Sequence, residues 1–134
     1  MNKKLQEIIE NSSFTIEEGK FIYAKVKRAP HMDCHFTVAK DSDEITVITK
    51  KENLNKLDLI EKNKDFYRLI ALNVSVPFYS VGFLSAVSDA VAKEGMNILI
   101  VSTYSKDYIM VKDDCLEKVR LVLLSLGFKR KKEI

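Results

Sequence analysis

The chain of 134 residues is 46% hydrophobic and 31% charged, so it is long enough to bury a core and too apolar to remain disordered. Its net charge of +3 is too small to indicate a nucleic-acid partner, and no apolar run approaches the roughly 18 residues of a membrane span. The two cysteines, Cys34 and Cys115, are too few and too far apart to indicate a disulfide framework or a zinc site.

The N-terminus carries lysines but lacks the apolar segment of a signal peptide. Gln6, Glu7 and Glu10 interrupt every apolar stretch in this region. We therefore expect a cytoplasmic protein with one domain or two small ones.

The N-terminal half is rich in strand-forming residues. Alternating apolar side chains predict a strand over Phe21–Val26. Phe36–Ala39 and Glu44–Thr49 predict two shorter strands, and the polar residues 40–43 between them are typical of a hairpin turn.

A charged stretch at residues 50–64 separates this half from the rest of the chain. We expect an N-terminal, strand-rich module at residues 1–63 and a C-terminal domain at residues 64–134. The C-terminal part has the order strand, helix, strand, strand, helix.

The first strand and helix of the C-terminal part have clear boundaries. An alternating apolar run over residues 67–76 predicts a strand that Pro77 ends. Ser80 is a good N-cap for the helix that follows, and Gly95 stands where a left-handed residue commonly ends a helix.

The next apolar run, Ile98–Val101, is apolar on both faces and predicts a central strand with a cover on each side. Because the C-terminal half supplies only one cover, we expect a partner surface, and a homodimer is the commonest solution. Residues 104–107 turn the chain into a second strand over Tyr108–Val111. A last helix begins at Asp114 and Glu117, which have the spacing of a capping box.

Three segments carry a resemblance to a known family: Ser102–Val111, Ala71–Val74 and Cys34–Thr46. At these residues the chain resembles the ACT-domain superfamily of ferredoxin-like regulatory modules. More narrowly, it resembles compact proteins with tandem ACT-like halves related to the aspartate-kinase regulatory region and to the cytosolic arginine sensor. The resemblance implies an α+β fold with two ACT-like βαββαβ modules, the first degenerate, with antiparallel sheets and helices packed on one face.

The resemblance also implies an amino-acid site at a module or subunit interface, formed by two segments. The first is the strand-to-helix loop at Ser80, Val81, Gly82 and Phe83. The second is the end of the following strand at Val101, Ser102, Thr103 and Tyr104, with Asp107 just beyond.

The chemistry of these residues suits a zwitterion. Backbone N–H groups of Val81, Gly82 and Phe83 at a helix N-terminus would bind the ligand carboxylate, and Gly82 lacks the Cβ that would hinder close approach. Strand carbonyls near Thr103, or the Asp107 carboxylate, would accept hydrogen bonds from the ligand ammonium.

Each of these residues also has a purely structural explanation. Close packing of helix on strand explains Gly82 equally well. Ser102 and Thr103 are ordinary strand-end hydroxyls, and Asp107 is a common turn residue.

The cluster at His31, Asp33, Cys34 and His35 offers metal-ligand side chains, but one local cluster falls short of a closed site. A nucleophilic Cys34–His35 pair is disfavoured, because neighbouring residues on a strand point to opposite faces. No phosphate-binding loop, nucleophile elbow or dinucleotide fingerprint is present. We expect no catalysis, no metal and no cofactor.

Together these features predict a non-catalytic regulatory or sensor protein that binds an amino acid. A metabolic enzyme or another regulatory partner would receive the signal. The alternative is an ACT-like dimerisation or interaction module that docks on a metabolic enzyme and has no ligand of its own.

Overall fold

The computed structural model describes residues 2–75 and 81–132. The chain forms two compact units, Met1–Glu17 with Leu69–Ile134 and Glu18–Arg68, which we call unit 1 and unit 2. The expected boundary at residue 63 differs from this division, because the first 17 residues belong with the C-terminal part. The ACT-like identity of a module at residues 1–63 stays a prediction.

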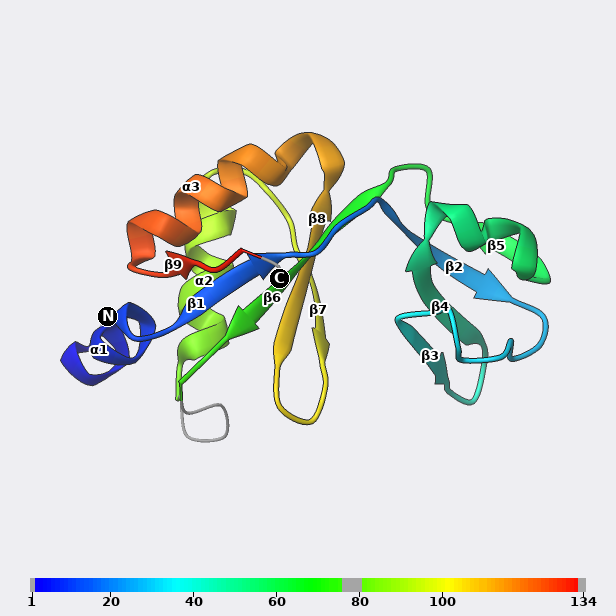
Figure 1. The fold of residues 1–134 in the computed structure, drawn as a ribbon, viewed down its shortest axis with the longest axis horizontal. Coiled ribbons are helices and arrows are strands. Elements are labelled where there is room, and N and C mark those ends of the chain that lie inside the picture. The colour runs from blue at the N-terminus through cyan, green and yellow to red at the C-terminus, as the bar shows by residue number, and fades with distance from the viewer. Residues whose placement is uncertain (1, 76–80, 133–134) are drawn as a thin grey trace. The chain divides into compact units, whose positions relative to one another are not determined.

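Unit 1 contains five paired strands in the order β7-β8-β6-β1-β9 (Figure 1). They are β1 (Ser13–Ile16), β6 (Tyr67–Asn73), β7 (Leu99–Ser102), β8 (Asp107–Lys112) and β9 (Lys129–Arg130). The β1 strand runs antiparallel to β6 and parallel to β9, so it separates these two strands in the sheet.

Three helices supply the other half of the unit 1 core. They are α1 (Lys3–Glu10), α2 (Phe83–Lys93) and α3 (Leu116–Leu126). Alternate residues of the strands, Phe14, Ile70 and Ile109, point into a cluster that all three helices join, and each of these side chains is fully buried. The helices contribute apolar residues at helical spacing: Leu5, Ile9, Phe83, Val87, Val91, Val119, Val122 and Leu123.

The helix ends agree only in part with the sequence. Gly95 has a φ of 77° just after α2, which confirms its expected left-handed role. The N-cap of α2 is Gly82, so the helix begins after the expected Ser80, which lies outside the described residues.

The expected capping box of α3 is wrong. Asp113–Cys115 form a 3-10 turn, and Cys115 occupies the N-cap position without a side-chain hydrogen bond that caps the helix. Glu117 instead accepts a hydrogen bond from Nε of Arg120 at 3.0 Å, one turn along the helix.

The expected central strand is also wrong. Within the described part of the chain, β7 pairs with β8 alone, so it lies at an edge of the unit 1 sheet. Ile100 is 43% exposed there, so the run is apolar on both faces without being buried on both.

Unit 2 is a four-stranded antiparallel sheet in the order β3-β4-β2-β5. Its elements are β2 (Phe21–Val26), β3 (Thr37–Lys40), β4 (Ile45–Lys50), the 3-10 helix η1 (Lys51–Lys56) and β5 (Leu59–Lys62). The expected hairpin is confirmed, since Oδ1 of Asp41 accepts hydrogen bonds from the backbone N–H groups of Asp43 and Glu44.

The α+β fold class is confirmed, and from β6 to β9 the chain has the βαββαβ order of a ferredoxin-like module. Residues 18–68 contain strands and a 3-10 helix but no α-helix. None of the helices in the described part of the chain has the length and apolar character of a membrane-spanning segment.

Candidate functional site

The second segment of the expected ligand site is the turn of the β7–β8 hairpin. Thr103 donates its backbone N–H to the carbonyl of Lys106 at 2.8 Å, and its hydroxyl donates to the same oxygen at 3.2 Å. Oγ of Ser102 donates to Oδ1 of Asp107. These hydrogen bonds hold the turn together. Tyr104 at its tip is 86% exposed and presents its phenol to solvent.

The first segment of the expected site is the start of α2. Val81 is 89% exposed, and Gly82 has a φ of 82°, a conformation that favours glycine. Phe83 is 3% exposed, and its ring meets that of Phe128 edge to face with centroids 5.8 Å apart. The Phe83 side chain therefore belongs to the core, and only its backbone remains available to a ligand.

The start of α2 lines a groove of about 650 Å³ in unit 1. Its walls come from the three helices and include Asn2, Val81, Gly82, Ser85, Asp89, Lys93 and Ser125. The hairpin residues Ser102, Thr103 and Asp107 do not line it. This groove does not bring the two segments together, and the amino-acid site stays a prediction.

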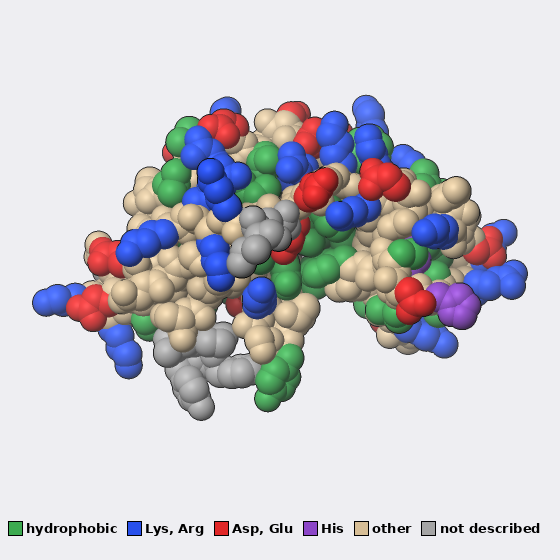
Figure 2. Space-filling model, viewed as in Figure 1, with side chains coloured by type: hydrophobic (Ala, Val, Ile, Leu, Met, Phe, Trp, Pro, Cys, Tyr) green, Lys and Arg blue, Asp and Glu red, His purple; other side chains and the backbone are tan. Residues whose placement is uncertain are grey.

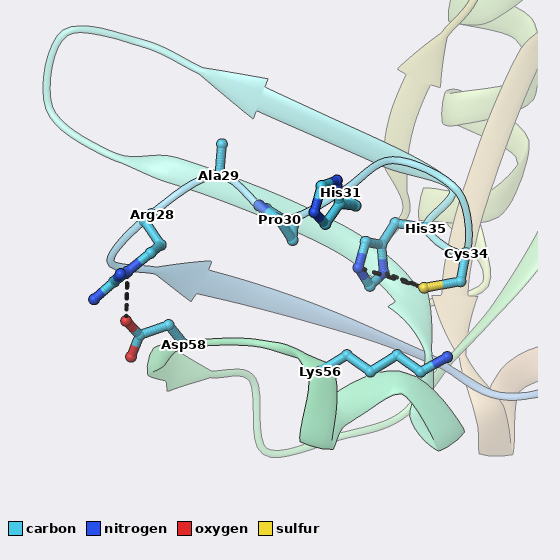
Figure 3. Close-up of a pocket in the computed structure, with 8 residues that line it drawn as sticks. All are labelled: Arg28, Ala29, Pro30, His31, Cys34, His35, Lys56 and Asp58. Carbon is cyan, nitrogen blue, oxygen red and sulfur yellow. Dashed lines mark hydrogen bonds and ion pairs between the residues drawn. The ribbon is translucent and has the colours of Figure 1, made fainter.

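A second cavity, of about 540 Å³, lies in unit 2 (Figure 3). One wall is the connection from β2 to β3, and the other is the end of η1 with the short segment that leads to β5. Its lining residues are Arg28, Ala29, Pro30, His31, Cys34, His35, Lys56 and Asp58. Figure 2 shows that histidine side chains reach the surface of the protein.

Cys34 and His35 contact each other at this cavity. The Cys34 Sγ lies 3.6 Å from Nε2 of His35 and 3.8 Å from Nδ1. The expectation that these side chains point apart is wrong, because the segment is a turn closed by the His35 N–H and the Met32 carbonyl at 3.0 Å. Neighbouring side chains in a turn can share one side, unlike those of a strand.

The His35 ring also contacts Thr49, a fully buried residue of β4. Nδ1 of His35 lies 2.9 Å from Oγ1 of Thr49, which also accepts a hydrogen bond from the Asn53 amide at 3.0 Å. The Thr49 hydroxyl donates to the Cys34 carbonyl at 3.3 Å. Because the single hydroxyl hydrogen is used there, we assign the proton of His35 to Nδ1 and leave Nε2 facing the Cys34 thiol.

Burial and the positive charge of Lys56 lower the pKa of the His35 imidazole below its ordinary value. Burial, followed by the neighbouring Asp114, raises the pKa of the Cys115 thiol. Cys34 is exposed whereas Cys115 is half-buried, so the two thiols have different access to solvent reagents.

In the part of the chain that the structure describes, no group of three or more histidine, cysteine or acidic side chains is placed to hold a metal ion. The sequence pattern indicated His31, Cys34 and His35 as candidate site residues, but it did not indicate Arg28, Thr49 or Lys56. Strand pairing and the η1 turn bring these residues together, and neither leaves a local motif.

Comparison with known proteins agrees with the fold. Residues 64–124 match the family model of the ACT domain. No curated protein gave a significant match to the chain.

Three solved structures are similar over most of this chain. A Vibrio cholerae protein described as of unknown function and a possible transport protein has a TM-score of 0.80 at 18% identity, over 93% of this chain and 97% of its own. The regulatory subunit of aspartate kinase from Thermus thermophilus has a TM-score of 0.60 at 9% identity, over 86% and 95%.

Aspartate kinase from Clostridium acetobutylicum, described as an allosteric enzyme, has a TM-score of 0.60 at 14% identity, over 87% of this chain and 33% of its own. The similarity to the aspartate-kinase structures is one of fold, since their sequences are far apart. Residues 64–124 are therefore similar to the ACT domain, and the chain shares its fold with the regulatory subunit of aspartate kinase from Thermus thermophilus.

Proposed function

We propose that the chain is a non-catalytic, cytoplasmic regulatory protein that binds an amino acid through the start of α2 and the β7–β8 hairpin. The match of residues 64–124 to the ACT domain carries this proposal, because that range includes both segments. The aspartate-kinase proteins of the same fold, described as an allosteric enzyme and a regulatory subunit, support a regulatory role.

The chemical case rests on two groups of opposite polarity. The backbone at Val81, Gly82 and Phe83 lies at the N-terminal end of α2, where the helix dipole favours the ligand carboxylate. The Asp107 carboxylate can accept from the ligand ammonium while Ser102 holds one of its oxygens, because a carboxylate has about four acceptor positions. Val101, Thr103 and Tyr104 complete the proposed hairpin part of the site.

Regulation would follow from differential binding. A ligand shifts the protein between two states only by the ratio of its affinities for them. A partner that recognises one state, such as a metabolic enzyme, would then respond to the amino-acid concentration.

The test is thermal unfolding of the dialysed protein against a panel of common amino acids. A ligand at about a hundredfold above its dissociation constant adds roughly 2.7 kcal/mol, which raises the melting temperature measurably. Asp107→Asn should abolish the response because it removes the charge, and Asp43→Asn in the β3–β4 turn is the matched control. A panel without any response, or an undiminished response of Asp107→Asn, would show that the proposed site is wrong.

A second candidate function is a dimerisation or docking module without a ligand. The exposed Ile100 on the edge strand β7 favours it, because edge strands pair readily with other chains. Light scattering of Ile100→Lys should then show a smaller assembly than wild type. Leu121→Lys on α3, which is 52% exposed, is the control for an added charge at an apolar surface position.

A further inference from the structure

We propose that the cavity of unit 2 binds a small oxyanion, such as a carboxylate or phosphate group, at Lys56 beside the Cys34–His35 pair, in a positive field to which Arg28 contributes. This site is separate from the amino-acid site proposed for unit 1 and does not depend on it. The cavity has room for a small molecule, and its lining residues come from two segments that are far apart in the sequence.

The charges that line the cavity are predominantly positive. Arg28 and Lys56 carry two positive charges against the single negative charge of Asp58. His31 and His35 add positive charge when they are protonated and no negative charge at any pH. An anion that enters the cavity therefore meets a favourable field.

A hydrogen bond to Asp58 orients the Arg28 side chain and occupies one of its N–H donors. Its Nε donates to Oδ2 of Asp58 at 3.0 Å (Figure 3). The backbone carbonyl of Asp58 in turn accepts from the Lys27 N–H at 2.9 Å, which anchors the pair to the end of β2. A guanidinium keeps its positive charge when it is paired, so Arg28 still contributes to the field that an anion in the cavity meets.

Lys56 is the second cation. It makes no ion pair with the other residues that line the cavity (Figure 3). Its positive charge acts on the His35 ring, since it lowers the pKa of that imidazole. The Lys56 ammonium is therefore close enough to attract an anion bound beside His35 and Cys34.

The wall that carries Cys34 is held in place before any ligand arrives. The Cys34 carbonyl accepts from the Asn53 amide at 2.9 Å and from the Thr49 hydroxyl at 3.3 Å. Phe36 donates its N–H to the Ile48 carbonyl at 2.9 Å, which ties the end of this connection to β4. A preformed wall reduces the ordering cost of binding.

The exposed Cys34 thiol makes the proposal testable in the full chain. Iodoacetate is an anion and iodoacetamide is its neutral counterpart. With both, the Cys34 sulfur forms a bond to carbon, iodide leaves and the thiol proton passes to solvent. Peptide mass spectrometry reports the rate at Cys34 separately from that at the half-buried Cys115.

The rate ratio of iodoacetate to iodoacetamide at Cys34 should be several-fold higher in the folded protein than in the urea-unfolded chain. Lys56→Gln and Arg28→Gln should each lower the ratio toward the unfolded value. Lys40→Gln on β3, which removes the same charge away from the cavity, should leave it unchanged. Circular dichroism melts confirm that each variant is folded.

Competition identifies the class of anion. Inorganic phosphate or malonate, at ionic strength matched with sodium chloride, should slow the iodoacetate reaction in wild type and not in Lys56→Gln. Protection by phosphate alone assigns a phosphate group, and protection by malonate alone assigns a carboxylate. An unchanged ratio in both cavity variants, or a lack of protection by either anion, overturns the proposal whatever the amino-acid panel shows.

Discussion

Oγ of Ser102 donates a hydrogen bond to Oδ1 of Asp107 at 2.5 Å, and so joins the last residue of β7 to the first residue of β8. These are two of the residues that the family resemblance marks as ligand contacts. In the structure they are partners of each other, on either side of the turn of an exposed hairpin.

The first prediction concerns the stability of this hairpin. Ser102→Ala should lower the free energy of unfolding by less than about 1 kcal/mol, because hydrogen bonds between exposed side chains contribute little net stability. Urea unfolding measures the change. A loss above about 2 kcal/mol would show that the bond supports the fold, and a failure of Asp107→Asn to bind ligand would then need a structural explanation.

The second prediction concerns two glycines with positive φ. Gly82→Ala should destabilise the protein by roughly 1–2 kcal/mol, because its φ of 82° disfavours a side chain, although the added Cβ would lie 3.6 Å from Leu5 in ordinary contact. Gly127→Ala should cost more, since its φ is 116° and the Cβ would also lie 3.2 Å from Glu10 Cγ. Guanidinium unfolding of both variants gives the order, and equal losses would contradict it.

The strain at Gly82 also decides how the proposed amino-acid site is tested. A bulky residue at Gly82 would lower stability whether or not a ligand binds there. Asp107→Asn avoids this ambiguity, because Asp107 is a half-buried residue at the start of β8 and its φ is not positive.

The third prediction concerns the buried hydroxyl of Thr49. Thr49→Val keeps the shape of the side chain but removes the partner of His35 Nδ1 and of the Asn53 amide. We expect a loss of about 1 kcal/mol, because the half-buried His35 ring and Asn53 amide each lose a hydrogen-bond partner. Thr46→Val on the same strand, where the hydroxyl has no such network, is the control in the same urea titration.

The fourth prediction concerns pH. Burial and Lys56 lower the pKa of His35 in the folded protein, so the unfolded chain takes up a proton at a higher pH than the folded chain does. The stability that neutral His35 contributes is therefore complete above a pH of about 6.5 and is lost as the pH falls through that value toward the folded-state pKa.

His35→Asn keeps an N–H donor at this position and does not titrate. The difference in free energy of unfolding between wild type and His35→Asn should fall from about pH 8 to about pH 5. Urea titrations at several pH values measure it. A difference that stays constant with pH would show that the ring keeps its ordinary affinity for a proton.

Much of the fold could be predicted because the local signals were strong. The alternation at Phe21–Val26 predicts β2 with the correct bounds, and the polar turn at 40–43 predicts the β3–β4 hairpin. Gly95 ends α2 as expected, because a left-handed residue is a local requirement.

The missed elements are short ones that depend on distant partners. Helix α1 has only eight residues, and its apolar face is Leu5 and Ile9, yet Asn2 caps it with a side-chain bond to the Leu5 N–H at 2.7 Å. That cap and the spacing of the two apolar residues were a usable signal. Strand β1 has four residues and forms only because β6 and β9 flank it.

The unit 2 cavity was harder to predict than the fold. His35 and Thr49 are 14 positions apart, and their contact depends on how the 31–36 turn folds against β4. The prediction that the Cys34 and His35 side chains point apart assumed that these residues lie on a strand. They lie in a turn, where the two side chains can meet. Local secondary structure decides which neighbouring side chains can meet.

The position of β1 between β6 and β9 determines when the protein can finish folding during synthesis. Phe14 pairs with Leu72 on one side and with Arg130 on the other, near the opposite end of the chain. At roughly 5–20 residues per second, a ribosome needs about 6–23 seconds to reach Arg130 after it has made Phe14. Unit 2 is formed by one continuous segment of the chain and can fold during this interval. In nascent unit 1, β1 must avoid aggregation until β9 has been made and can pair with it.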